Sequence, residues 1–60
     1  MTLDELLDVV DSSVSIILLE LPEYDEYEYK DTRRIPKEDL NRRVVKVEPF
    51  GKYKLYITIR

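Results

Sequence analysis

The segment from Val14 to Leu21 constrains the fold most, because it reads as a β-strand that is apolar on both of its faces. Successive side chains of a strand point to opposite sides, and here Val14, Ile16 and Leu18 alternate with Ile17, Leu19 and Leu21. Pro22 ends the strand, because proline has no amide hydrogen for a ladder. One short helix covers only one face of a small sheet, so we expect the second face to meet another subunit.

Self-association also follows from the size of the chain. A domain of 60 residues has a marginal core of its own, and such domains are usually supported by disulfides, a metal or association. The sequence has no Cys and no His, which excludes disulfides and zinc sites of the usual kind. We therefore expect a homodimer or tetramer whose interface contains Ile17, Leu19, Leu21, Ile57 and Ile59.

A short helix is predicted before this strand. Thr2 and Glu5 have the spacing of a capping box, in which each side chain bonds to the backbone amide of the other residue. The helix therefore begins at Leu3 and ends in a turn at residues 11–13. Its buried face has the spacing i, i+3, i+4, i+7 and consists of Leu3, Leu6, Leu7 and Val10.

The rest of the chain predicts three more strands and one helical turn. A half-exposed strand is expected within residues 23–30, after an irregular turn at residues 23–25. A single helical turn over residues 35–40 has Pro36 in its first position. A strand over residues 43–48 places Val45 and Val47 opposite its other side chains, and it forms a hairpin with a strand over residues 53–60. We predict one α+β domain over residues 1–60: an N-terminal helix on a small, curved, mainly antiparallel four-stranded sheet.

Charge is distributed unevenly along the chain. Residues 1–32 contain ten acids and one base, a net charge of −9, whereas residues 33–60 contain nine bases and three acids, a net charge of +6. Such asymmetry indicates a nucleic-acid face, two surfaces that attract each other between subunits, or a solvated mixed surface. The candidate nucleic-acid-binding residues are Arg42, Arg43, Lys46, Lys52, Lys54, Tyr56 and Arg60.

The acidic segment over residues 20–31 has two interpretations. Alternating tyrosines and carboxylates could imitate the charge spacing of nucleic acid. Alternatively, the charges protect an edge strand from aggregation.

Catalytic chemistry is restricted to few residue types. Without His or Cys, acids, bases and nucleophiles come from carboxylates, Lys, Tyr, Ser and Thr. Asp8 and Asp11 lie three residues apart and are candidates for catalysis, with Asp11 also a candidate Mg²⁺ ligand. The alternative is that both acids serve solvation and turn formation, as Ser12 and Ser13 do.

No membrane segment is expected. A spanning helix needs roughly 18 apolar residues, and no run in this sequence approaches that length. The amino terminus is acidic, unlike that of a signal peptide. We therefore expect a cytoplasmic protein.

The segments 2–11 and 35–45, separated by a β-strand, resemble small proteins carried by phages and mobile elements of gut Firmicutes. Some of these look like PC4-like nucleic-acid-binding folds, and one group is similar to an anti-CRISPR that nicks supercoiled DNA and protects it from Cas9. The resemblance implies an oligomer of small curved sheets in a bacterial host cell that engages double-stranded or supercoiled DNA. It also implies Mg²⁺-dependent nicking supported by an acid near the helix-to-strand turn, a position that Asp11 fits.

Three functions follow as hypotheses. The first is an anti-defence protein, expected to be an anti-CRISPR, that binds, nicks or relaxes DNA. The second is a non-catalytic inhibitor that docks onto a host defence protein. The third is an oligomeric sponge for a signalling nucleotide.

Overall fold

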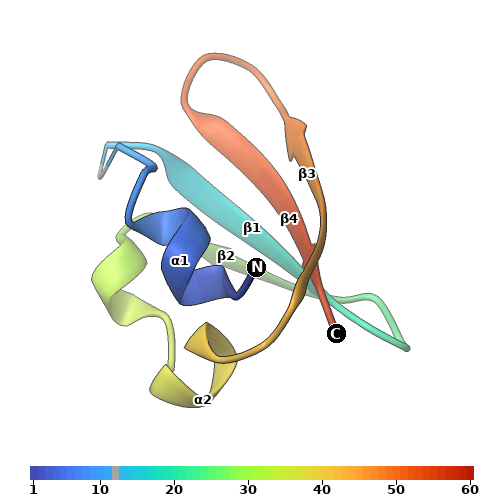
Figure 1. Cartoon of the computed structure of the whole chain (residues 1–60). Helices are drawn as coiled ribbons and strands as arrows, with labels where there is room; N and C mark the ends of the chain where they lie inside the picture. Colours follow the sequence, from blue (N-terminus) through green and yellow to red (C-terminus); the bar gives the residue numbers. More distant parts are fainter. Residues whose placement is uncertain (12) are drawn as a thin grey trace.

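The computed structural model describes residues 1–11 and 13–60 and shows a small α+β fold (Figure 1). Its elements in chain order are α1 (Leu3–Leu7), β1 (Ser15–Glu20), β2 (Asp25–Tyr29), the 3₁₀ turn η1 (Thr32–Arg34), α2 (Lys37–Leu40), β3 (Val44–Pro49) and β4 (Lys54–Ile59). Ser12, part of the predicted turn, lies outside the described residues. The predicted α+β class, the four-stranded sheet and the β3–β4 hairpin are confirmed.

The sheet is mixed, with the strand order β2-β1-β4-β3. The β3–β4 pair is antiparallel, as expected for the predicted hairpin; the β1–β2 pair is also antiparallel, but the central pair β1–β4 is parallel. Strands β1 and β4 are the most apolar, and burial favours the middle of a sheet for such strands. Strand β3 runs in the same direction as β2, so that β4, which reverses the direction of β3 in the hairpin, is parallel to β1.

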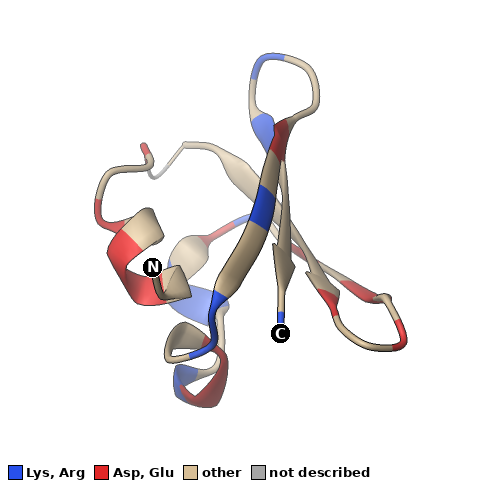
Figure 2. Ribbon diagram, turned by 45° about the vertical axis from the view of Figure 1, so that its right-hand side comes forward, with Lys and Arg blue, Asp and Glu red and all other residues tan. Residues whose placement is uncertain are grey.

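Both helices lie on the same side of the sheet (Figures 1 and 2). Between the two layers is the core, which consists of Leu3, Ile16, Leu18, Ile35, Ile57 and Ile59. Leu6, Leu7 and Val10 pack against it, so the predicted apolar face of the first helix is confirmed. The regular helix ends at Leu7, and i→i−3 hydrogen bonds from the amides of Val9 (3.1 Å) and Val10 (3.3 Å) continue it as turns.

The amino terminus is held at two points. The capping box is present: the Thr2 amide donates to Glu5 Oε1 at 2.8 Å, and the Glu5 amide donates to Thr2 Oγ1 at 3.3 Å. The same segment also lies against the beginning of β3, since the Leu3 amide donates to the Arg42 carbonyl and the Val44 amide to the Met1 carbonyl, both at 2.9 Å. This contact between the amino terminus and the beginning of β3 joins residues about forty positions apart, and the local sequence pattern did not predict it.

The predicted arrangement of valines in β3 is wrong. A register irregularity between Val44 and Lys46 lets Val44 oppose Ile59 and Val47 oppose Ile57, so both lie on the core side. Val45, the extra residue of this bulge, is 51% exposed. Simple alternation had placed Val45 with Val47.

The helical turn before β3 is close to its predicted position. Pro36 is the N-cap rather than the first helical residue. Ile35 is buried and Leu40 packs against the core, as expected. Along the described residues, no helix has both the length and the apolar character that a membrane crossing requires.

Candidate functional site: the open face of the sheet

The face of the sheet opposite the helices is the candidate site, and we call it the open face. Neither α1 nor α2 covers it (Figure 2). Alternation within the strands and the register between them place the following side chains on it: Ile17 and Leu19 from β1, Glu26 and Glu28 from β2, Lys46 and Glu48 from β3, and Lys54, Tyr56 and Thr58 from β4.

The centre of the open face is apolar and already partly covered by its own neighbours. Ile17 is only 5% exposed and Thr58 is 7% exposed. The register places Glu28 on one side of Ile17 and Tyr56 on the other, and these long side chains shield it from solvent. Leu19 is half-buried beside Thr58. The strand predicted to be apolar on both sides is therefore apolar on both sides in the structure.

Both lysines of the open face are paired with glutamates. Lys54 Nζ lies 3.5 Å from Glu28 Oε2, and Lys46 Nζ lies 3.3 Å from Glu48 Oε1. All four side chains are between 44% and 63% exposed, so water screens each pair. The two lysine charges are nevertheless balanced locally, which reduces the attraction of this face for phosphate groups.

An aromatic pair extends the open face toward the β3–β4 turn. The rings of Phe50 and Tyr56 meet edge to face, with centroids 5.2 Å apart and an interplanar angle of 78°. The Phe50 amide donates to the Lys54 carbonyl at 2.9 Å, and Gly51 supplies the positive φ of 74° that the turn requires. Phe50 is 55% exposed, so the pair presents aromatic surface to solvent.

The strand order converts the charge asymmetry of the sequence into an asymmetry across the sheet. The β1–β2 half of the open face carries Glu26 and Glu28. The β4–β3 half carries Lys46 and Lys54 with Glu48, and Arg60 follows β4 directly. Figure 2 shows the same separation, with acidic residues at the β1–β2 turn and most of the basic residues of the sheet along the β3–β4 hairpin.

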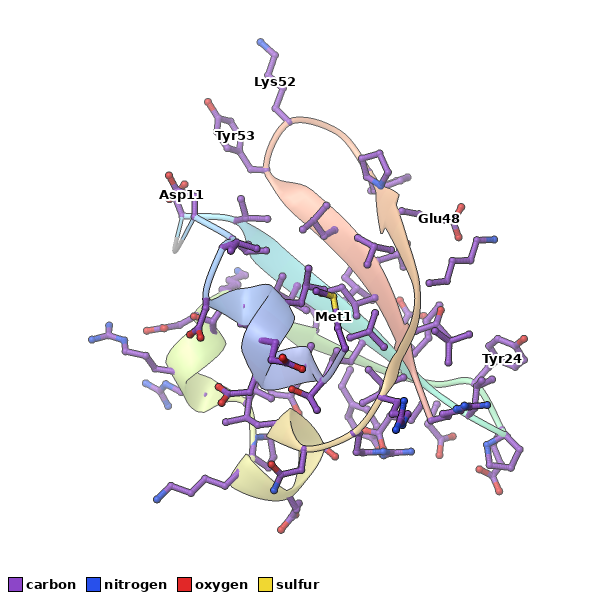
Figure 3. All side chains as sticks on the ribbon, viewed as in Figure 1. Met1, Asp11, Tyr24, Glu48, Lys52 and Tyr53 are labelled. Atoms are coloured by element: carbon purple, nitrogen blue, oxygen red, sulfur yellow. The ribbon has the colours of Figure 1, made fainter. Side chains whose placement is uncertain are left out.

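The predicted nucleic-acid-binding residues do not form one group. Lys46, Lys54 and Tyr56 lie on the open face as described above, while exposed Lys52 projects from the hairpin turn (Figure 3). Arg43 and Arg60 are exposed neighbours, because the Arg60 amide donates to the Arg43 carbonyl at 3.0 Å.

Arg42 belongs to an internal ion cluster. Its guanidinium pairs with the Glu20 carboxylate and lies 3.5 Å from Asp39 Oδ1, and it also donates to the Leu21 carbonyl at 3.4 Å. All three charged side chains are less than 30% exposed. Burial raises the pKa of Tyr29, and the carboxylates of Asp39 and Glu20 raise it further. Sequence reasoning missed this cluster, whose only local signal is the i, i+3 spacing of Asp39 and Arg42.

The catalytic candidates Asp8 and Asp11 are both exposed, and the Asp11 carboxylate has a local structural role. Asp11 Oδ1 accepts a hydrogen bond from the Ser13 amide at 2.8 Å, and this bond lowers the pKa of Asp11. In Figure 3, Asp11 points outward from the loop before β1. Asp8 caps the end of α1, its amide donating to the Asp4 carbonyl at 3.2 Å. Within residues 1–11 and 13–60, no three Asp or Glu side chains are grouped as metal ligands.

The predicted interface residues differ in exposure. Ile57 and Ile59 are fully buried in the core between the sheet and the helices. Leu19 and Leu21 are half-buried, and Ile17 lies at the centre of the open face. Among the predicted interface residues, the partly accessible ones are therefore Leu19 in β1 and Leu21, which follows β1.

Comparisons with protein-family models, with curated proteins and with solved structures give no match for this chain.

Proposed function

We propose that this protein acts by binding another polypeptide chain through its open face. The main support for this proposal is that the open face has an apolar and aromatic centre, while both of its lysines are paired with glutamates. Protein interfaces combine aromatic anchors with a polar rim, whereas nucleic-acid faces require an excess of positive charge. The resemblance to proteins of phages and mobile elements makes a host defence protein the expected class of target, and docking would inhibit it without catalysis.

The proposal is tested with two matched variants. Phe50→Asp places a charge on the open face, whereas Val9→Asp places one on the helix side at a residue that is 79% exposed. Both positions are exposed, so both variants should fold, as circular dichroism would show. In affinity capture from host-cell extract, we expect wild type and Val9→Asp to retain the same protein and Phe50→Asp to lose it. Equal capture by the two variants would contradict the proposal.

DNA binding is the second candidate, and the exposed neighbours Arg43 and Arg60 favour it. The resemblance to PC4-like and DNA-nicking proteins belongs to this candidate, with Asp11 as the acid that supports nicking and Mg²⁺ as the cofactor. The test is incubation of the protein with supercoiled plasmid and Mg²⁺. Relaxation that is lost in a folded Asp11→Ala variant would favour this candidate over protein docking. Relaxation unchanged by Asp11→Ala would remove Asp11 from the mechanism.

A further inference from the structure

The open face is complementary in charge to itself. Its β1–β2 half carries two glutamates and is followed by Lys30, whereas its β4–β3 half carries two lysines and one glutamate and is followed by Arg60, so the first half is the more acidic. The order β2-β1-β4-β3 keeps these halves on opposite sides of the apolar centre. A surface divided in this way matches a second copy of itself when the copy is turned so that unlike halves meet.

We infer that the polypeptide bound by the open face is a second copy of this chain, packed face to face about a two-fold axis parallel to the strands. This inference rests on the proposed function only in that the open face binds a polypeptide, and it assigns a second copy of the chain to that face in place of a host defence protein. Such an axis reverses the strand order of the copy, so that β2 lies over β3 of the second copy and β1 lies over β4. An in-plane axis perpendicular to the strands would place β2 over β2 and bring the acidic halves together.

The register gives the contacts of this dimer. Glu26, Leu19, Thr58 and Lys46 lie at one level across the sheet, because each is paired with the next in the ladder. In the dimer, Glu26 therefore faces Lys46 of the second copy, and Leu19 faces its Thr58. These contacts occur twice, as two-fold symmetry requires.

The neighbouring level completes the interface. There Ile17 faces Tyr56 of the second copy, which adds aromatic surface over the apolar centre. Glu28 faces Glu48 of the second copy, but each glutamate keeps its own lysine, Lys54 or Lys46, at 3.5 and 3.3 Å. In the dimer Lys46 thus lies between its own Glu48 and Glu26 of the second copy, so that two Glu26–Lys46 contacts are gained while the two Glu28–Glu48 contacts oppose them.

Charge reversal tests the arrangement. Glu26→Lys and Lys46→Glu should each weaken the dimer about tenfold or more, because each places like charges in contact. An equimolar mixture of the two variants should form a heterodimer, since both contacts then again join a lysine to a glutamate. Glu38→Lys, an exposed reversal on α2, is the control and should leave the dimer unchanged. Light scattering and sedimentation at low and high salt give the readout, with circular dichroism to verify folding.

Several outcomes would overturn the inference. These are a wild-type monomer at micromolar concentration, a dimer that neither reversal weakens, or a mixture that fails to assemble although both variants are folded. A monomer whose capture of a cellular protein is lost only in Phe50→Asp would overturn the dimer and leave the proposed function standing. A dimer whose cellular capture survives Phe50→Asp would instead limit the open face to self-association.

Discussion

Lys54 Nζ lies 3.5 Å from Glu28 Oε2, so that an ion pair connects β4 to β2 across the strand between them. The stems of both side chains lie on the open face, where Glu28 is the register neighbour of Ile17. This helps to explain how Ile17 is only 5% exposed on a face that neither α1 nor α2 covers.

The Lys54–Glu28 pair should contribute little free energy of unfolding. Both side chains are more than 40% exposed, so we expect a coupling energy below about 1 kcal/mol, which salt decreases further. A double-mutant cycle with Lys54→Ala and Glu28→Ala, followed by urea denaturation at low and high salt, measures it. A coupling of several kcal/mol that salt does not change would show that the pair is far less solvated than its exposure indicates.

The bulge in β3 predicts unequal effects of two neighbouring valines. Val44 packs on the core side opposite Ile59, so Val44→Ala should lower the free energy of unfolding by about 1 kcal/mol. Val45 is 51% exposed, and Val45→Ala should change it by less than about 0.5 kcal/mol. Urea denaturation of both variants provides the comparison. A larger loss of stability in Val45→Ala than in Val44→Ala would contradict the bulge, because that is the result that unbroken alternation along β3 predicts.

Arg42 is predicted to stabilise the fold rather than to bind a ligand. Arg42→Met preserves much of the volume but leaves the Glu20 and Asp39 carboxylates without their partner. We expect a loss of about 1–3 kcal/mol in the free energy of unfolding. Arg43→Met, at an exposed residue, is the matched control and should change it by less than about 0.5 kcal/mol. Equal stability of both variants, measured by urea denaturation, would contradict a structural role for Arg42.

Acidic pH should destabilise the protein through three carboxyl groups. Hydrogen bonds from Thr2 lower the pKa of Glu5, those from Ser13 lower the pKa of Asp11, and those from Arg33 lower the pKa of Asp31. A folded-state pKa below the unfolded value of 4.5 for Glu or 3.8 for Asp means that the stabilisation is complete above the unfolded value. It is then lost as the pH falls through the folded value.

The measurement is the urea midpoint between neutral pH and about pH 2, a range that brackets these transitions. Asp31→Asn should lose part of this pH dependence, because Asp31 Oδ2 then no longer holds the Arg33 guanidinium at 2.9 Å as a charged pair. The effect should be small, since both groups are exposed. An Asp31→Asn variant with the full wild-type pH dependence would remove Asp31 from this account.

Local patterns in the sequence were sufficient to predict the two α-helices and the four strands, although the 3₁₀ turn at Thr32–Arg34 was expected to be a loop. The capping box of Thr2 and Glu5 joins residues three apart, and the helix that follows begins at Leu3 as expected. Strand β4 was the segment with the most regular alternation, and its observed bounds lie within one residue of the predicted ones at each end. Such features depend on neighbouring residues, so the order of side chains along the chain is enough to determine them.

Much of the candidate site depended on contacts between distant residues. Strand β1 pairs in parallel with β4, and Arg42 forms an ion pair with Glu20. Both contacts join segments more than twenty residues apart. The bulge at Val45 is a relation between two strands, so alternation within one strand did not reveal it. The sequence by itself determined which residues are apolar, charged or able to cap. Only the tertiary structure decided which charges neutralise one another and which apolar face stays open, because those outcomes depend on strand order and register.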